Sequence, residues 1–447
     1  MPDRNAKPYA QVLPEVQRAV AGSIRSDINK MSEEALKDMI RRYIIDHSIH
    51  AADVPDDQLE NYIYHDMAGL SFISRERLFE QKGFEEININ AWDDIEVVVD
   101  GCRQKKDYTF LSPQQAIDIH QRMLRDSTGT VFNDAQPRAT ADIGEGIRIT
   151  ALKTPLVDAD VAVASSIRKV NTQTISRELL LAGGALTDEM ATFLELCIMH
   201  GVSMCISGET GSGKTTIAGC LLAKASKVLR TYTIEEGSRE WKFVFRDSIT
   251  GKIVNSVLHT KTHPNPDNPK LDIDQEDLVK DSLRFDPDII APGEIRGREA
   301  FEVMGVSNTG HTVITTTHSN GTLDTPERIV TLAKKAFDMS DPTLFGMAAR
   351  AFPILVHMEK GPDRRRRVTE IREVTGYHNG EIQSTLLFEF DVEDNIYNGD
   401  VCIEVKGKFC QLAGISLGLQ KRLLKKGARR AELEPYIMPG GSGQEGS

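Results

Sequence analysis

The first part of the chain carries apolar residues at helical spacing. In "SEEALKDMIRRYII", Leu36, Met39, Ile40 and Tyr43 have the spacing of one helix face, and Ser32 precedes them as a candidate helix N-cap. The stretch "DDQLENYIYHDMAGL" repeats this spacing. We therefore expect residues 1–82 to form a helical N-terminal extension.

After residue 82 the pattern changes to the alternation that is typical of strands. "FEEININAWDDIEVVV" predicts two strands joined by a turn at Ala91–Asp94, and "GIRITAL" and "DVAVASSIRKV" predict further strands. Between them, "SPQQAIDIHQRML" predicts a helix that begins at Ser112. Residues 83–170 are expected to form a small α+β domain, and residues 171–186, which contain two adjacent glycines, a linker.

Beyond residue 187, strands and helices alternate, which is typical of an α/β domain built on a parallel sheet. "VSMCIS", "RTYTIEE", "DIIAPGE" and "HTVITTTH" predict strands, and the last three end in polar or charged residues. Ligands of such sheets bind at the carboxyl ends of the strands. We expect this domain over residues 187–437 and a disordered tail, rich in glycine and serine, over residues 438–447.

The composition narrows the classes of function. Of the 447 residues, 27% are charged, and the formal net charge of −12 argues against a nucleic-acid-binding protein. No apolar run approaches the roughly 20 residues that span a bilayer. The N-terminus lacks the hydrophobic core of a signal peptide. We therefore expect a cytoplasmic protein that does not itself cross the membrane.

The stretch "GETGSGKT" has the spacing of a phosphate-binding loop. It follows a predicted strand and opens a predicted helix, so backbone N–H groups and the positive end of that helix would face the phosphates. Lys214 would neutralise the β- and γ-phosphates, and the hydroxyl of Thr215 would ligate Mg²⁺. The predicted site for ATP and Mg²⁺ comprises Gly208, Glu209, Thr210, Gly211, Ser212, Gly213, Lys214, Thr215 and Thr216.

Two further strand ends carry carboxylates. Glu235 and Glu236 could orient Mg²⁺ or polarise an attacking water, and an exposed acidic turn is the alternative. Glu294 follows the apolar strand 289–291 and precedes Arg296. In a phosphate-loop protein, a carboxylate at such a position holds Mg²⁺ through water or activates the nucleophile.

The stretch "TGHTVITTTHSN" places His311 and His318 at the two ends of a predicted strand. Because residues seven positions apart in a strand face opposite sides, we do not expect a shared metal ion. His318, at the carboxyl end, could donate a hydrogen bond to the γ-phosphate. A histidine with its hydrogen bonds satisfied in the core is the alternative.

In this order and spacing, the four stretches resemble the type II/type IV secretion ATPase family. "IEE", "PGEIRGREA" and "TGHTVITTTHSN" resemble its Asp box, its atypical Walker B motif and its His box, and the resemblance covers about residues 83–435. The stretches "EEININAWDDIEVVV" and "RVTEIREVTGYHNGEI" are most similar to the Tad/Flp pilus assembly ATPase branch (CpaF/TadA-like).

This resemblance implies an α/β fold with a RecA-like P-loop domain after a smaller α+β domain, and a homo-hexameric ring that binds ATP between the two domains. Arg148 and Arg168 would complete the site from the N-terminal side. Glu294 would activate water, Glu235 would support Mg²⁺ through water, and Arg296 belongs to the same motif as Glu294. The implied partner is a polytopic inner-membrane platform protein, which would hold the ATPase at the cytoplasmic face of the membrane without direct contact to nucleic acid.

Three stretches depart from this pattern or stand outside it. The family's Asp box usually reads Glu-Asp, whereas this chain has Glu235–Glu236, so the role of Glu236 stays open. Residues 241–272 form a longer connection than is usual and predict an extra hairpin. The basic run Arg364–Arg367 is interpreted as a solvated loop.

Two alternatives to a motor for pilus assembly or secretion, including conjugative transfer, stay open. A nucleic-acid translocase could share the RecA-like core, although the acidic balance disfavours it. A nucleotide-binding scaffold with little hydrolysis would be consistent with the altered Asp box.

Overall fold

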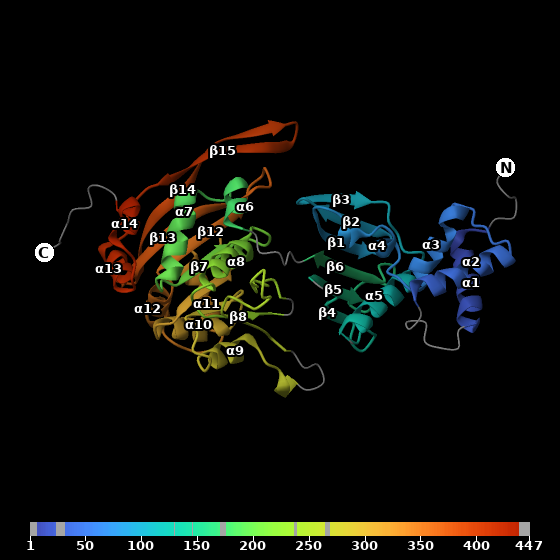
Figure 1. The fold of residues 1–447 in the computed structure, drawn as a ribbon, viewed down its shortest axis with the longest axis horizontal. Helices are drawn as coiled ribbons and strands as arrows, with labels where there is room; N and C mark the ends of the chain where they lie inside the picture. The colour runs from blue at the N-terminus through green and yellow to red at the C-terminus, as the bar shows by residue number, and fades with distance from the viewer. Residues whose placement is uncertain are drawn as a thin grey trace. The chain divides into compact units, whose positions relative to one another are not determined.

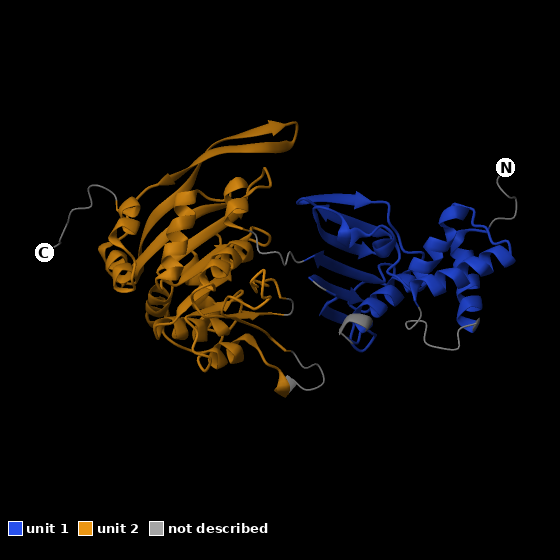
Figure 2. Ribbon diagram, viewed as in Figure 1, with its two compact units in different colours: residues 1–170 blue, residues 171–447 orange. Residues whose placement is uncertain are grey.

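The structure, a computed structural model, describes residues 7–23, 32–128, 130–144, 146–169, 176–236, 239–263 and 269–437. The expected tail 438–447 therefore lies outside the described residues. The chain divides into two units, residues 1–170 and 171–447 (Figure 2).

The N-terminal part of the first unit is helical, as the apolar spacing predicted (Figure 1). Its helices are α1 (Tyr9–Ser23), α2 (Glu33–Asp46), α3 (Asp56–Met67) and α4 (Phe72–Arg75), followed by a 3₁₀ helix at Leu78–Glu80. Ser32 caps α2, because its hydroxyl accepts the backbone N–H of Ala35 at 3.3 Å. Buried apolar residues of α1, α2 and α3, among them Val16, Ile40 and Leu59, form one hydrophobic cluster.

The rest of the first unit is an antiparallel sheet with one long helix, α5 (Pro113–Thr128). Six described strands lie in the order β3-β2-β1-β6-β5-β4. They are β1 (Phe84–Ala91), β2 (Asp94–Val99), β3 (Cys102–Lys106), β4 (Arg138–Asp142), β5 (Ile147–Lys153) and β6 (Val163–Lys169). Ile119 of α5 packs with Ile87 of β1 and Ile149 of β5 in one buried cluster.

The second unit is built on a larger sheet, in which nine described strands lie in the order β15-β14-β13-β12-β7-β11-β10-β8-β9. The pairs from β12 to β9 are parallel, and those from β12 to β15 are antiparallel. The parallel strands are β7 (Met204–Gly208), β8 (Thr231–Glu235), β9 (Val257–Lys261), β10 (Ile289–Pro292), β11 (Thr312–Thr317) and β12 (Ile354–Lys360). The antiparallel extension consists of β13 (Arg366–His378), β14 (Glu381–Asn398) and β15 (Val401–Gln411).

Helices cover both faces of this sheet. Successive residues of its central strand, β7, point to opposite faces and therefore pack against different helices. Ile206 of β7 is buried in a cluster with residues of α7 (Asp188–Met199), α8 (Lys214–Ala225) and α13 (Leu417–Lys425). Its neighbour Cys205 belongs to a second cluster. That cluster includes residues of α9 (Gln275–Ser282), α10 (Glu299–Asn308), α11 (Thr325–Ala333) and α12 (Asp341–Ala351). The short elements are α6 (Arg177–Ala182), α14 (Arg430–Leu433) and 3₁₀ helices at Pro269–Leu271 and Glu434–Tyr436.

This architecture confirms the predicted α/β fold, in which a RecA-like P-loop domain follows a smaller α+β domain and a helical segment. Among the described residues, no helix is both long enough and apolar enough to cross a membrane.

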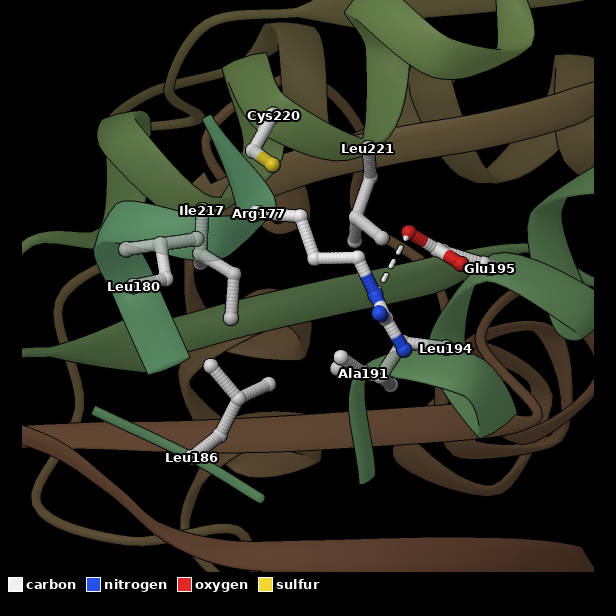
Figure 3. Close-up of a pocket in the computed structure, with 9 residues that line it drawn as sticks. All are labelled: Arg177, Leu180, Leu186, Ala191, Leu194, Glu195, Ile217, Cys220 and Leu221. Atoms are coloured by element: carbon white, nitrogen blue, oxygen red, sulfur yellow. Dashed lines mark ion pairs between the residues drawn. The ribbon is translucent and has the colours of Figure 1, made fainter. Parts of the chain in front are cut away.

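Two local predictions need correction. The expected linker 171–186 is wrong from residue 177 onward, where α6 forms and its first residue, Arg177, lies 3.3 Å from Glu195 of α7 (Figure 3). In the stretch 241–272, β9 adds to the sheet in parallel beside β8. Among the described residues of this stretch no antiparallel strand pair forms the expected hairpin, and isolated antiparallel bridges join Arg246 to Ile253 and His263 to Ile273.

Candidate functional site

The phosphate loop joins the end of β7 to the start of α8, as the sequence predicted. Gly208 has a φ of 145°, and a Cβ atom there would lie 2.2 Å from the carbonyl oxygen of Met358 on the adjacent β12. Gly213, directly before α8, has a φ of 100°. Position 208 therefore favours glycine for both its backbone angle and its close approach to β12, and position 213 favours glycine for its backbone angle.

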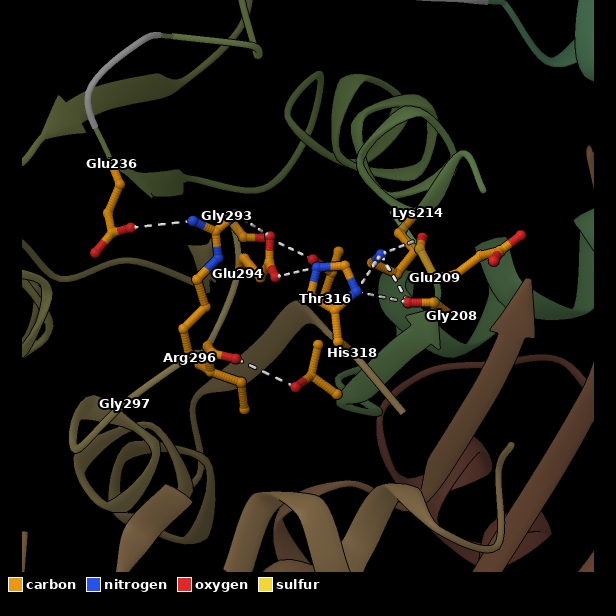
Figure 4. A network of polar contacts seen from close by, with 12 residues as sticks. Gly208, Glu209, Lys214, Glu236, Gly293, Glu294, Arg296, Gly297, Thr316 and His318 are labelled. Atoms are coloured by element: carbon orange, nitrogen blue, oxygen red, sulfur yellow. Dashed lines mark hydrogen bonds and ion pairs between the residues drawn. The ribbon is translucent and has the colours of Figure 1, made fainter. Parts of the chain in front are cut away.

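Lys214 lies folded into this loop and is only 6% exposed. Its Nζ donates to the carbonyl oxygens of Gly208 at 2.9 Å and Glu209 at 2.8 Å (Figure 4). The ammonium therefore lies where the loop turns around a phosphate. Glu209 and Thr210 are exposed, whereas Ser212 is buried.

Glu294 and His318 meet beside the loop. Gly208, Glu294 and His318 lie at or just beyond the carboxyl ends of β7, β10 and β11, which are neighbours in the parallel sheet. The Nε2 atom of His318 lies 2.9 Å from Oε1 of Glu294. Its Nδ1 lies 3.0 Å from the carbonyl oxygen of Gly208 and 3.4 Å from Nζ of Lys214 (Figure 4). The structure thus brings three of the predicted side chains into one cluster.

Arg296 holds the other carboxylate oxygen of Glu294, with Nη2 donating to Oε2 at 2.6 Å. Burial alone would raise the pKa of Glu294. The hydrogen bond and the charge of Arg296 outweigh burial, with smaller effects from His318 and Lys214, so the pKa of Glu294 lies below its ordinary value. Burial and the charge of Lys214 lower the pKa of His318, against the opposing effect of Glu294. These shifts favour the ionised form of the carboxylate and the neutral form of the imidazole.

The two carboxylates of the stretch that resembles the Asp box, Glu235 and Glu236, point in different directions. Glu235, the last residue of β8, is 5% exposed, and its Oε1 accepts the backbone N–H groups of Glu240 at 2.6 Å and Trp241 at 3.0 Å. Burial raises the pKa of Glu235 to about 7, although these two hydrogen bonds oppose the shift. Glu236 is exposed and lies 3.6 Å from Nη1 of Arg296. Glu236 thus reaches the Glu294 cluster through Arg296, whereas Glu235 points into the protein.

Two contacts to the loop were missed by sequence reasoning. The indole Nε1 of Trp241 donates to the carbonyl oxygen of Thr215 at 2.9 Å. Nε of Arg366 donates to the carbonyl oxygen of Gly211 at 2.7 Å. Arg366 is exposed, as expected for the basic run, but it begins β13 rather than lying in a loop. The interpretation as a solvated loop is wrong for Arg367, which is 6% exposed and paired with a carboxylate.

The residues present fit a nucleotide with its magnesium ion. Ser212 Oγ and Glu235 Oε2 are buried and have no hydrogen-bond partner among the described residues. Ser212 belongs to the loop, where a phosphate oxygen would supply its partner, and Glu235 ends β8 in the same sheet, where metal-bound water would supply one. In the described part of the chain, no group of three or more His, Cys, Asp or Glu side chains could hold a metal ion.

Arg148 and Arg168 lie in the first unit, on β5 and β6. In the antiparallel register they are direct partners. Asp142 on β4 pairs with Arg148, and Glu86 on β1 pairs with Arg168. Because cross-strand partners share a face of the sheet, the two guanidinium groups arise from one face. Their role at the ATP site stays a prediction.

Comparisons with known proteins agree with these motifs. A family described as "Type II/IV secretion system protein" matches residues 145–382. A putative conjugal transfer protein of Mycobacterium tuberculosis is 23% identical over 71% of this chain and 88% of its own length. The conjugal transfer protein TrbB of Rhizobium radiobacter is 26% identical over 56% of this chain and 72% of its own. Among solved structures, the ATPase DotB of Legionella pneumophila is 21% identical, with a TM-score of 0.46 over 66% of this chain and 78% of its own.

Proposed function

The chain belongs to the type II/IV secretion system protein family, and from this premise we propose that it is an ATPase that powers macromolecular transfer or assembly at a membrane. The observation that carries the proposal is the meeting of Glu294, His318 and Lys214 around the phosphate loop. A carboxylate, an imidazole and an ammonium at the ends of neighbouring parallel strands are suited to phosphoryl transfer to water.

In this function, Lys214 exchanges the carbonyl oxygens of Gly208 and Glu209 for phosphate oxygens when ATP enters the loop. Glu294, ionised and held on one side by Arg296, accepts a hydrogen bond from the attacking water and orients it. The ring of His318 lies against the second carboxylate oxygen, with Nε2 2.9 Å from Oε1 of Glu294, and so restricts the orientation of the carboxylate. The Thr215 hydroxyl, and Glu235 through water, would hold the Mg²⁺ that accompanies ATP, and the ion would supply neutralisation of the phosphate charge.

The assembly that uses this activity is proposed from the family resemblance. A homo-hexameric ring places Arg148 and Arg168 against the phosphates of ATP, and a guanidinium there stabilises the charge that develops during transfer. The ring acts at the cytoplasmic face of the membrane through a polytopic inner-membrane platform protein. Its system is a pilus of the Tad/Flp type or a related secretion or conjugal transfer apparatus, and the curated relatives named conjugal transfer proteins support the wider class.

The test is steady-state ATP hydrolysis with Mg²⁺ by the wild type, Glu294→Gln and Lys214→Ala, with ATP binding and molecular mass measured in the same buffer. We expect Glu294→Gln to bind ATP while its kcat falls by about 10²- to 10⁴-fold, because general acid–base groups contribute rate enhancements of that size. Lys214→Ala should lose ATP binding. If the wild type binds ATP but does not exceed Lys214→Ala in hydrolysis, with or without membranes that contain its platform protein, the ATPase proposal fails and a nucleotide-binding scaffold replaces it.

A further inference from the structure

We propose that Trp241 is a positioning residue of the ATPase site, which couples the first turn of the phosphate-loop helix to the carboxylate of Glu235. This proposal rests on the proposed ATPase function, because it concerns the same site. Trp241 is not part of the phosphate loop or of the carboxylate and histidine motifs. It lies on the segment that follows β8, outside the regular strands.

Three contacts attach Trp241 to the site. Its indole N–H donates to the carbonyl oxygen of Thr215, the second residue of α8, at 2.9 Å. Its backbone N–H donates to Oε1 of Glu235 at 3.0 Å. Its ring packs so closely on Gly219, one turn further along α8, that a Cβ atom there would lie 2.9 Å from Cδ1 of the indole. Trp241 is 3% exposed, so water does not compete for these contacts.

These contacts join the two groups proposed to serve Mg²⁺. The carbonyl that accepts the indole N–H belongs to Thr215, whose hydroxyl is the predicted metal ligand. The main chain of Trp241 fixes the orientation of Glu235, the predicted ligand of metal-bound water. Residues that hold ligands by hydrogen bonds set the geometry of a metal site, and removing them weakens metal binding or activity. If α8 shifts when nucleotide binds, the movement reaches Glu235 through this one buried residue, from the indole of Trp241 to its main-chain N–H.

A purely structural role is the competing explanation, since Trp241 also belongs to the buried cluster around α7 and α8. Trp241→Phe separates the two roles, because phenylalanine keeps an aromatic ring in the core but cannot donate a hydrogen bond. We expect kcat to fall about tenfold and the Mg²⁺ concentration for half-maximal rate to rise several-fold, with a nearly unchanged KM for ATP. The matched control Trp92→Phe removes the tryptophan of the first unit and should leave these parameters unchanged.

Fluorescence gives a readout that does not depend on turnover. The chain contains two tryptophans, so in Trp92→Phe all tryptophan emission comes from Trp241. We expect a hydrolysis-resistant ATP analogue with Mg²⁺ to change the intensity or wavelength of this emission, and the change to vanish when Lys214→Ala is added. Binding of the analogue is measured in parallel with a fluorescent nucleotide excited away from tryptophan.

The outcomes are distinct. A silent Trp241 emission while the nucleotide binds, or wild-type kcat and Mg²⁺ dependence in Trp241→Phe, overturns the coupling and leaves Trp241 as a core residue. If the wild type shows no hydrolysis while Trp241 responds to nucleotide, the proposed ATPase function fails and the coupling stands. A melting temperature within a few degrees of wild type for Trp241→Phe ensures that lost activity is not lost folding.

Discussion

Gly219→Ala tests the packing between α8 and Trp241 directly. Gly219 lies inside α8, and an added Cβ would lie 2.9 Å from Cδ1 and 3.0 Å from Nε1 of the indole. The first distance is shorter than Cβ atoms tolerate and the second is unusually tight. A buried indole cannot swing away as the end of a flexible side chain does. The ring must shift, which strains or breaks its hydrogen bond to Thr215.

The expected change in the free energy of unfolding is a sum of three contributions. Alanine in place of glycine inside a helix stabilises by about 1 kcal/mol. Overpacking a filled core costs about 1–3 kcal/mol, and loss of the indole hydrogen bond costs about 1 kcal/mol. Gly219→Ala should therefore destabilise the protein by about 1–3 kcal/mol, as measured by urea unfolding of the second unit.

The same substitution should change sign when the indole is absent. In a Trp241→Leu background, Gly219→Ala should stabilise by up to about 1 kcal/mol, so the coupling between the two sites is about 2–4 kcal/mol. Gly305, inside α10, is the matched control, because a Cβ there meets nothing within 4 Å. If Gly219→Ala stabilises the wild-type background as much as Gly305→Ala does, the indole does not limit this site and the reasoning is refuted.

Two further predictions concern buried charge. His120 is fully buried between Ala116 and Ser165, and burial lowers its pKa from 6.5 to about 4. The pKa of His120 is lower in the folded state than in the unfolded state, so the unfolded state binds the proton first as pH falls. The free energy of unfolding therefore decreases by about 3 kcal/mol between about pH 6.5 and pH 4. His120→Gln should flatten the pH dependence of the urea midpoint over this range, and an unchanged slope would contradict the assignment. The two carboxylate oxygens of Asp363 accept hydrogen bonds from Arg367 at 2.9 and 2.6 Å. Asp363→Asn leaves the buried guanidinium of Arg367 without its carboxylate and should lower the free energy of unfolding by about 3–5 kcal/mol in the same assay. A Gln substitution at an exposed surface glutamate, the control, should not have this effect.

The elements that could be predicted from the sequence are those specified by a short stretch of neighbouring residues. The strands that end at Gly208 and Glu235 are runs of buried residues bounded by polar ones, and the phosphate loop needs glycines at fixed spacing. The short helix α6 was missed because its six residues are too few for a helical period to show, and two following glycines resemble a linker.

Contacts between distant segments could not be read from the sequence. Arg366 reaches Gly211 across 155 positions, only because β12 pairs with β7 and turns back into β13. Which of Glu235 and Glu236 points inward depends on where the segment after β8 places the N–H groups of Glu240 and Trp241, and adjacency in the sequence leaves both assignments open. The cluster of Glu294 and His318 was predictable in outline, because the carboxyl ends of parallel strands meet at one edge.

The direct pairing of Arg148 with Arg168 constrains how this chain can change in length. The strands that carry them, β5 and β6, are joined through residues 154–162. A residue inserted in that connection leaves the pairing intact, whereas a residue inserted within either strand, between an arginine and the connection, moves one guanidinium to the opposite face. Among descendants of this gene, insertions and deletions should therefore accumulate in the connection and be absent from the paired segments.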